Sequence, residues 1–224
     1  MKLLIKFIFR MKTVAIIVSI LLVLLFVVLS IWDKGLFKLH PSLMAVSYLG
    51  CMFQAIYIFS TDDTSRSRSL TRRKQILIHS ILQVGTIICA IIGFIAIYLN
   101  KEERNKPHFV TWHGLIGLIA FIWSLLQAFA GLFLTILQQY IHSLGLTYAQ
   151  LRIYHATSGV LLFTLSCMVL ILGLASNWFK SKMPNNTIAY SIIFYFLTSS
   201  MLFLAHKCVE QVKNRYVKRK VAVK

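Results

Sequence analysis

Residues 76–99 read ILIHSILQVGTIICAIIGFIAIYL, a stretch with no Lys, Arg, Asp or Glu and with one histidine, His79, near its start. A charge-free apolar run of about 18 residues or more is long enough to cross the hydrocarbon layer of a membrane as a helix. Outward from this stretch, in both directions along the chain, lie five further runs of the same kind. They cover residues 13–32, 41–60, 111–138, 153–178 and 188–206. The sequence therefore predicts six membrane-spanning helices.

The composition agrees with this prediction. Of the 224 residues 58% are hydrophobic, and 24 Lys and Arg against 6 Asp and Glu give a formal net charge of +18. These charges fall in the short segments between the apolar runs, which excludes an ordinary soluble domain and argues against a nucleic-acid-binding face. Because backbone groups in lipid must find their hydrogen bonds within the chain, we expect an all-α bundle, formed by a single domain over residues 1–224.

The distribution of cations predicts the orientation of the bundle. If the N-terminus lies in the cytosol, 17 of the 24 Lys and Arg residues fall on the cytosolic side and seven on the other. Cytosolic loops of membrane proteins carry an excess of these residues, so we expect both termini in the cytosol. The first run, 13–32, is longer than the hydrophobic part of a signal peptide, and no A-x-A-like site follows it. We interpret it as a retained membrane helix.

Four of the seven histidines stand at the start of a predicted span: His40, His79, His113 and His155. Consecutive spans run in opposite directions across the membrane. We therefore expect His40 and His113 in one layer near the non-cytosolic side, and His79 and His155 in a second layer near the cytosolic side. Any one of them could be an interfacial or capping residue. Four of them, matched in depth, indicate a functional site because polar groups at membrane depth are costly.

Two imidazoles in one layer suit a haem iron. Zinc takes three or four protein ligands, and no Asp, Glu or Cys is placed to complete such a set, whereas a haem brings four nitrogens and needs only two axial ligands. The four cysteines show no CxxCH spacing, so we expect non-covalent haem b. Small or rigid residues next to the histidines leave room for a flat macrocycle. These are Pro41, Ser80, Gly114 and Ala156, with Gly117 and Gly159 one turn further on. Iron held by two histidines has no open position, which favours electron transfer over oxygen binding.

Four stretches resemble the cytochrome b561 family. They are LHPSLM at 39–44, the span with His79, HFVTWHG at 108–114, and YHATSG at 154–159. The resemblance covers nearly the whole chain. It implies a six-helix protein whose spans two to five form a four-helix core around two b haems. The implied axial ligands are His40 with His113 and His79 with His155. It also implies transmembrane electron transfer from cytosolic ascorbate to monodehydroascorbate radical or ferric chelates on the other side.

The same resemblance suggests where substrates bind. Ascorbate is an anion, and basic residues lie at the cytosolic edge of the inner histidine layer. The candidates are Arg72, Arg73, Lys74 and Arg152. The excess of cations on the cytosolic side alone could also place them there. On the other side, His108 and Phe109 precede His113 and are candidates for the acceptor site, although His108 could be an ordinary loop histidine. No residue is expected to act as a separate catalytic group.

Two other functions are compatible with the residues alone. The chain could be a haem b membrane subunit that passes electrons to quinone or to a partner dehydrogenase. It could also be a haem-free transporter, although no carboxylate lies at membrane depth. Membrane lipid is an expected partner, a homodimer is one assembly to consider, and no nucleic-acid partner is expected. An endoplasmic reticulum or cytoplasmic vesicle membrane is favoured over the plasma membrane.

Overall fold

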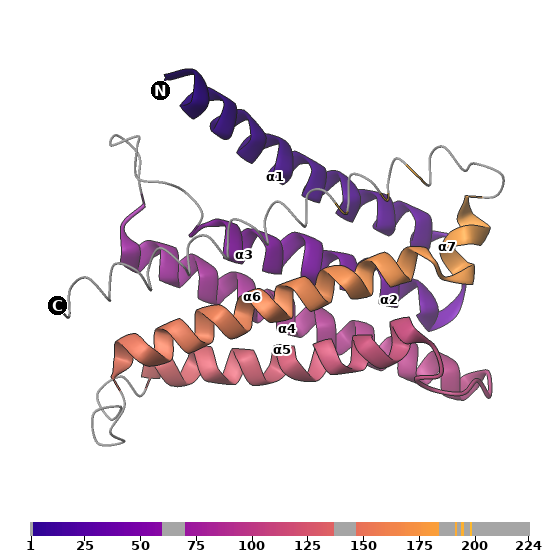
Figure 1. Cartoon of the computed structure of the whole chain (residues 1–224). Helices are drawn as coiled ribbons and strands as arrows, with labels where there is room; N and C mark the ends of the chain where they lie inside the picture. Colours follow the sequence, from indigo (N-terminus) through magenta and orange to yellow (C-terminus); the bar gives the residue numbers. More distant parts are fainter. Residues whose placement is uncertain are drawn as a thin grey trace.

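The computed structural model describes residues 2–59, 70–136 and 147–183, together with the single positions 191, 194 and 198, and it describes side chains from residue 13 onward. All regular secondary structure in this part of the chain is helical. The long helices lie side by side as a bundle, with α1 (Lys2–Ile31) along one side (Figure 1). The all-α prediction is confirmed for the described residues.

Among the residues that the structure describes, four helices are long and apolar enough to cross a membrane. They are α1 through its segment Thr13–Ile31, α4 (Arg72–Glu103), α5 (Trp112–Ile136) and α6 (Tyr148–Leu174). Helix α4 begins four residues before the predicted run because the hydroxyl of Thr71 accepts a hydrogen bond from the backbone N–H of Lys74 and caps it. Helix α6 begins early for a similar reason, a capping box between Thr147 and Gln150.

The second predicted run, 41–60, forms three consecutive helical elements. These are α2 (Leu39–Met44), the π-helical segment η2 (Ala45–Met52) and α3 (Phe53–Tyr57). A carbonyl of the π-helical segment η2 accepts a hydrogen bond from a neighbouring helix, because Ser19 Oγ on α1 donates to Leu49 O at 2.5 Å. Ser47 within it donates to Thr86 O on α4 at 2.8 Å. A π segment adds one residue to a helix and often lies at a functional site.

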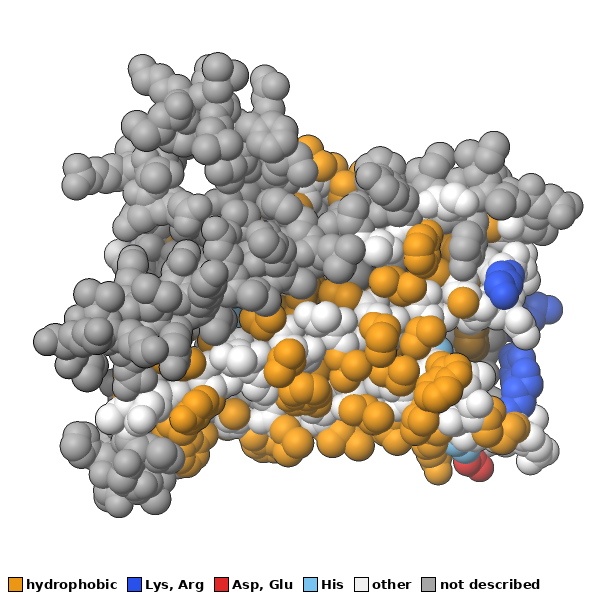
Figure 2. Space-filling model, in the orientation of Figure 1, with side chains coloured by type: hydrophobic (Ala, Val, Ile, Leu, Met, Phe, Trp, Pro, Cys, Tyr) orange, Lys and Arg blue, Asp and Glu red, His pale blue; other side chains and the backbone are white. Residues whose placement is uncertain are grey.

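The helices pack in a definite order. Helix α4 packs against α2, η2 and α3, helix α1 packs against η2 and α2, and helix α5 packs against α6. Large apolar side chains remain exposed along all four long helices, and Figure 2 shows them covering the length of the bundle. Lys and Arg side chains gather at one end of the visible face. An apolar girdle with charges at its end is the surface expected in a bilayer.

The short helix α7 (Asn177–Lys182) closes one end of the bundle. Lys182 Nζ lies 2.7 Å from one carboxylate oxygen of Asp33, and Trp178 Nε1 donates to the other at 2.6 Å. Asp33 follows α1 and precedes the short 3-10 helix η1 (Gly35–Lys38), so these contacts fasten α7 to the α1–α2 connection. The sixth predicted run, 188–206, lies outside the described residues except for its three isolated positions.

Candidate functional site

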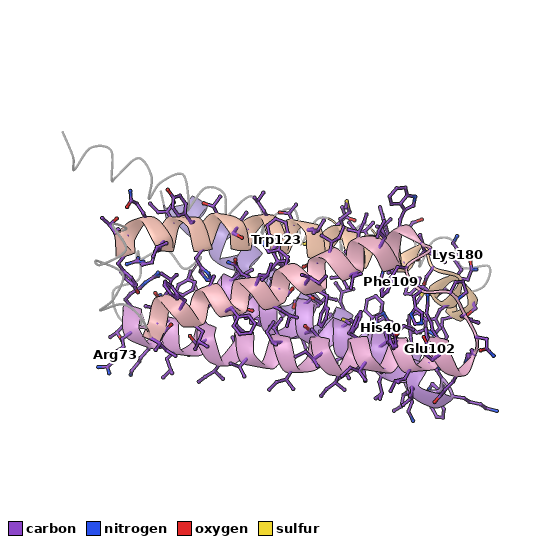
Figure 3. All side chains as sticks on the ribbon, turned by 90° about the horizontal axis from the view of Figure 1, so that it is seen from below. His40, Arg73, Glu102, Phe109, Trp123 and Lys180 are labelled. Carbon is purple, nitrogen blue, oxygen red and sulfur yellow. The ribbon has the colours of Figure 1, made fainter. Side chains whose placement is uncertain are left out.

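His40 on α2 and His113 on α5 form one pair, which we call the outer pair after the side of the membrane on which it is predicted to lie. The ring centres of His40 and His113 lie 6.2 Å apart, and the ring planes are nearly perpendicular at 84°. Each ring is also hydrogen-bonded through its Nδ1 to the backbone of a helix that runs antiparallel to its own. His40 Nδ1 donates to Gly93 O on α4 at 3.1 Å, and His113 Nδ1 donates to Val169 O on α6 at 3.0 Å. Figure 3 places His40 at the end of the bundle that carries Glu102, Phe109 and Lys180.

His79 on α4 and His155 on α6 form the other pair, which we call the inner pair after its predicted cytosolic side. The ring centres of His79 and His155 lie 6.4 Å apart, again at 84°. His79 Nδ1 donates to Ala55 O on α3 at 2.9 Å. His155 differs, because its Nδ1 lies 3.2 Å from the side-chain nitrogen of Gln127 on α5. The pairing predicted from the alternating directions of the spans is therefore confirmed, whereas the ligand roles of the four histidines stay predictions.

This arrangement can hold a metal between two rings. Where Nδ1 donates to a carbonyl, the ring proton is fixed on Nδ1 and Nε2 keeps a free lone pair. Metal–imidazole bonds of about 2 Å, plus roughly 1 Å from each nitrogen to its ring centre, put two ring centres about 6 Å apart on opposite sides of one metal ion. Within the described residues, no three His, Cys, Asp or Glu side chains come together as a metal site. Two imidazole rings at this spacing suit a metal ion that brings its other ligands with it.

Helices α5 and α6 repeat one pattern. In each, the histidine is followed after four residues by glycine, after eleven by serine and after eighteen by glycine. Eighteen residues make five full turns, about 27 Å, so the histidine and the last glycine lie on one face. Because the two helices are antiparallel, each histidine meets the last glycine of the other helix. A Cβ built on Gly173 would lie 3.2 Å from His113 Cε1, and one on Gly131 would lie 3.2 Å from His155 Cε1.

The glycines beside the histidine rings are thus Gly131 and Gly173. Gly117 and Gly159, which the sequence suggested as space for a macrocycle, face other side chains. A Cβ on Gly117 would lie 3.5 Å from Val169 Cγ1, and one on Gly159 would lie 3.0 Å from Gln127 Nε2. Their place at the α5–α6 contact allows close helix packing.

Helices α2–α3 and α4 form a second, similar pair. Ser47 and Thr86 each lie seven residues after the histidine of their own helix, and each donates to the other's carbonyl, at 2.8 and 3.5 Å. The carbonyl that accepts from His79 belongs to Ala55, and the one that accepts from His40 belongs to Gly93. The interval from His40 to Ala55 is one residue longer than the interval from His79 to Gly93. The π segment η2 lies within the longer interval and accounts for the additional residue.

The candidate acceptor residues lie beside the C-terminal part of α4, at the end of the bundle that holds the outer pair. His108 Nε2 is 2.8 Å from Glu102 Oε1, and its ring stacks on Tyr98 at 4.4 Å. Phe109 has a left-handed backbone, with φ of 54°, and its ring stacks on Phe94. His108 is therefore fixed by an acidic and an aromatic partner, and it is not an unattached loop histidine.

The candidate donor residues lie at the opposite end. The Arg72 guanidinium lies 4.4 Å from the centre of the Phe59 ring, which in turn lies 5.1 Å from the ring of His79. Arg152 lies over Tyr148 at 5.6 Å and is exposed. Arg73 and Lys74 are also exposed, and Figure 3 shows Arg73 at the bundle end far from His40. Arg72 is thus the basic residue joined to the inner pair through an aromatic ring.

Apolar helices of membrane length, with polar side chains paired in the interior, define an integral membrane protein of the helical class. The chain matches the family described as eukaryotic cytochrome b561 over residues 39–180. It is 32% identical to Transmembrane reductase CYB561D2 of Bos taurus over 84% of this chain and 80% of that one. It is 28% identical to Probable transmembrane reductase CYB561D1 of Mus musculus, over 86% and 80%.

A more distant relative, Plasma membrane ascorbate-dependent reductase CYBRD1 of Rattus norvegicus, is 26% identical over 66% of this chain and 50% of its own length. The chain belongs to the cytochrome b561 family, so the resemblance drawn from its motifs is confirmed. It is accordingly a membrane oxidoreductase from a haem-binding family.

Gln127, Gly131 and Gly173 lie at the histidine rings but do not stand out in the sequence. The one signal for them is the repeated spacing of histidine, serine and glycine on α5 and α6, which becomes meaningful once the helices are known to be antiparallel partners. Gln127 is not part of this repeat, because the residue at the equivalent position on α6 is Val169.

Proposed function

We propose that the chain transfers electrons across the membrane from cytosolic ascorbate to monodehydroascorbate radical or a ferric chelate on the other side. The observation that carries this proposal is the presence of two histidine pairs, 6.2 and 6.4 Å between ring centres, in two separate layers of one apolar bundle. Names of relatives support the chemistry, because several are transmembrane reductases and one is ascorbate-dependent.

The residues present fit two haem b groups. His40 with His113 would hold one iron, and His79 with His155 the other. The ring spacing matches a metal ion between two imidazoles, and Gly131 and Gly173 keep the space beside the rings free of side chains. Bound there, the two haems would supply one-electron redox chemistry at two depths of the membrane. The protein's part is to orient the four rings and to exclude water with its apolar helices.

Ascorbate fits the cytosolic end. Arg72, Arg73, Lys74 and Arg152 give this end positive charge, which attracts an anion. Arg72 and Arg152 rest on aromatic rings, so their charged groups are held in fixed directions. The aromatic contact from Arg72 through Phe59 to His79 brings this charge close to the inner pair.

The acceptor fits the opposite end. His108, held by Glu102, can take up or release a proton beside an incoming radical anion, and Phe109 packs next to it. Lys101 Nζ donates to Pro107 O at 2.8 Å and stiffens the same connection. These residues give the outer end a site that differs in chemistry from the cytosolic end.

The finer organisation belongs to the same proposal. We place six spans in one domain over residues 1–224, with spans two to five around the haems and both termini in the cytosol. The endoplasmic reticulum or vesicle membrane, the contact with lipid and a homodimeric assembly stay predictions.

The decisive experiment is a reduced-minus-oxidised absorption spectrum of the purified protein with ascorbate as reductant. We expect a b-type haem signal that ascorbate develops. A folded protein without haem would contradict the proposal and leave the transporter alternative. Haem that dithionite reduces but ascorbate does not would indicate a subunit that serves quinone or a dehydrogenase.

The variant Arg152→Gln tests the donor site. Loss of this exposed charge should raise the KM for ascorbate several-fold and leave the haem content unchanged, because Arg152 does not contact the histidine rings in the described structure. Lys180→Gln, at the opposite end on α7, is the matched control and should leave the KM unchanged. An equal response of both variants would argue for a general surface-charge effect instead of a site.

A further inference from the structure

The four histidines do not have equivalent hydrogen-bond partners. His40, His79 and His113 each donate Nδ1–H to a backbone carbonyl of an opposing helix, at 2.9 to 3.1 Å. His155 instead has the side-chain amide nitrogen of Gln127 at 3.2 Å from its Nδ1. The same nitrogen donates to the backbone carbonyl of His155 at 2.6 Å. One ring of the inner pair is therefore held by a different chemical group.

The orientation of the Gln127 amide follows from its contacts. A carbonyl oxygen can only accept, so the atom bonded to His155 O must be the amide nitrogen and not its oxygen. That nitrogen carries hydrogens and has no lone pair to offer a ring N–H. His155 Nδ1 thus faces a hydrogen-bond donor, where the other three histidines face an acceptor.

The pseudo-symmetry of α5 and α6 shows that this is a local departure from a common plan. Gln127 follows His113 at the same interval at which Val169 follows His155, so the two residues are equivalent. Val169 faces Gly117, and Gln127 faces Gly159, where a built Cβ would lie 3.0 Å from the amide nitrogen. Glycine at 159 leaves the space that the Gln127 side chain occupies. Val169 offers its backbone carbonyl to His113, whereas Gln127 puts its side chain next to His155.

We propose that Gln127 is a positioning residue for the haem held by His79 and His155. It makes this haem easier to reduce than the same haem would be if His155 Nδ1–H donated to a backbone carbonyl. The inference rests on the proposed function, because it requires haem in both layers. An Nδ1–H bonded to a carbonyl makes an imidazole a more basic ligand and favours ferric iron. When His155 Nε2 binds iron, the neutral ring carries its proton on Nδ1, and the amide nitrogen of Gln127 cannot accept a hydrogen bond from it. Without an acceptor for that proton, His155 is the less basic ligand, which favours ferrous iron. Hydrogen bonding around the axial ligands is one of the means by which a protein sets haem potential.

The test exchanges the two equivalent residues. Gln127→Val gives the inner pair the residue that stands at the equivalent position beside the outer pair. It allows His155 Nδ1–H to approach the backbone carbonyl of residue 127. Gln127→Leu removes the amide at similar volume, in case the smaller side chain impairs folding. Val169→Gln introduces the amide next to His113. Each purified protein is titrated potentiometrically while the haem absorption is followed, and His155→Ala identifies the inner component as the one that disappears.

We expect the reduction equilibrium constant of the inner haem to fall about threefold to tenfold in Gln127→Val and Gln127→Leu, where tenfold equals about 59 mV for one electron. Val169→Gln should shift the outer component in the opposite direction. Full haem content with unchanged midpoints in both Gln127 variants would overturn the inference and leave the proposed function intact. A wild-type protein without haem would overturn the proposed function, and the inference with it.

Discussion

A single hydrogen on Gly131 separates the backbone of α5 from the ring of His155. A methyl group in its place would lie 3.2 Å from the ring carbon Cε1, closer than atoms in folded proteins normally pack. Overpacking of this kind costs about 1–3 kcal/mol. We therefore expect Gly131→Ala to displace the His155 ring and to lower the haem-to-protein ratio, measured by absorbance, through loss at the inner pair.

Gly117→Ala provides the matched control on the same helix. Its methyl group would meet Val169 Cγ1 at 3.5 Å, an ordinary contact. This variant should retain the full haem content. Equal haem loss from both variants would mean that the glycines serve helix packing alone and do not keep the ring space open.

The histidines themselves separate the two layers. His40→Ala removes one ring of the outer pair and should abolish one of two b-type signals, while the inner haem is still reduced by ascorbate. His79→Ala removes one ring of the inner pair and should abolish reduction by ascorbate. Rapid-mixing spectroscopy of the two variants measures this difference. If ascorbate reduces His79→Ala as fast as wild type, the donor side is assigned to the wrong layer.

At the scale of residues, the sequence predicts the histidine pairs but not their partners. The pairing follows from the position of each histidine at the start of its span and from the alternating directions of the spans. Gln127 and Gly131 could not be found in this way, because their contacts depend on the rotation and depth of α5 against α6. The ion pair of His108 with Glu102 depends on the chain turning back after α4 at Asn105, whose φ is positive, so the two side chains meet only once this loop is folded.

At the scale of elements, α7 is held to the rest of the bundle by Asp33. The Asp33 and Lys182 side chains are 18% and 23% exposed, so water screens their attraction only in part. A partly exposed ion pair is worth about 1 kcal/mol or less, which in a chain of this size corresponds to about 2–4 °C. Asp33→Asn keeps the shape and an acceptor for Trp178. It should lower the apparent Tm in detergent by that amount.

Lys180→Gln is the control for this substitution. Lys180 lies on the same short helix and forms no ion pair with a residue that the structure describes. Its loss should leave the apparent Tm within error of wild type. A Tm of Asp33→Asn equal to that of the control would show that the contact is seen in the structure but adds no stability.

The long helices could be predicted because a charge-free apolar run has one stable conformation in lipid. The π segment η2 could not, since residues 45–52 have the same apolar character as the helices around them. What distinguishes this segment is the partners of its carbonyl groups, the hydroxyls of Ser19 and Thr86 on neighbouring helices. Such partners become visible only when the helices are assembled.

At the scale of the whole molecule, orientation can be tested by labelling. In a background with the native cysteines replaced, Arg73→Cys and Lys106→Cys place one thiol at each end of the bundle. A membrane-impermeant maleimide added to sealed microsomes should label Arg73→Cys directly and Lys106→Cys only after permeabilisation. The reverse pattern would invert the proposed topology and assign the basic end to the lumen.

The matched spacing on α5 and α6 makes the interior nearly the same when seen from either side of the membrane. Two such similar halves give the protein little structural preference for one direction of electron transfer. We therefore expect net flow to reverse when the stronger reductant is supplied on the opposite face of a vesicle. Apart from Gln127 in the inner layer, any bias comes from the two ends of the bundle, where an arginine on an aromatic ring at one end is matched by a histidine–glutamate pair at the other.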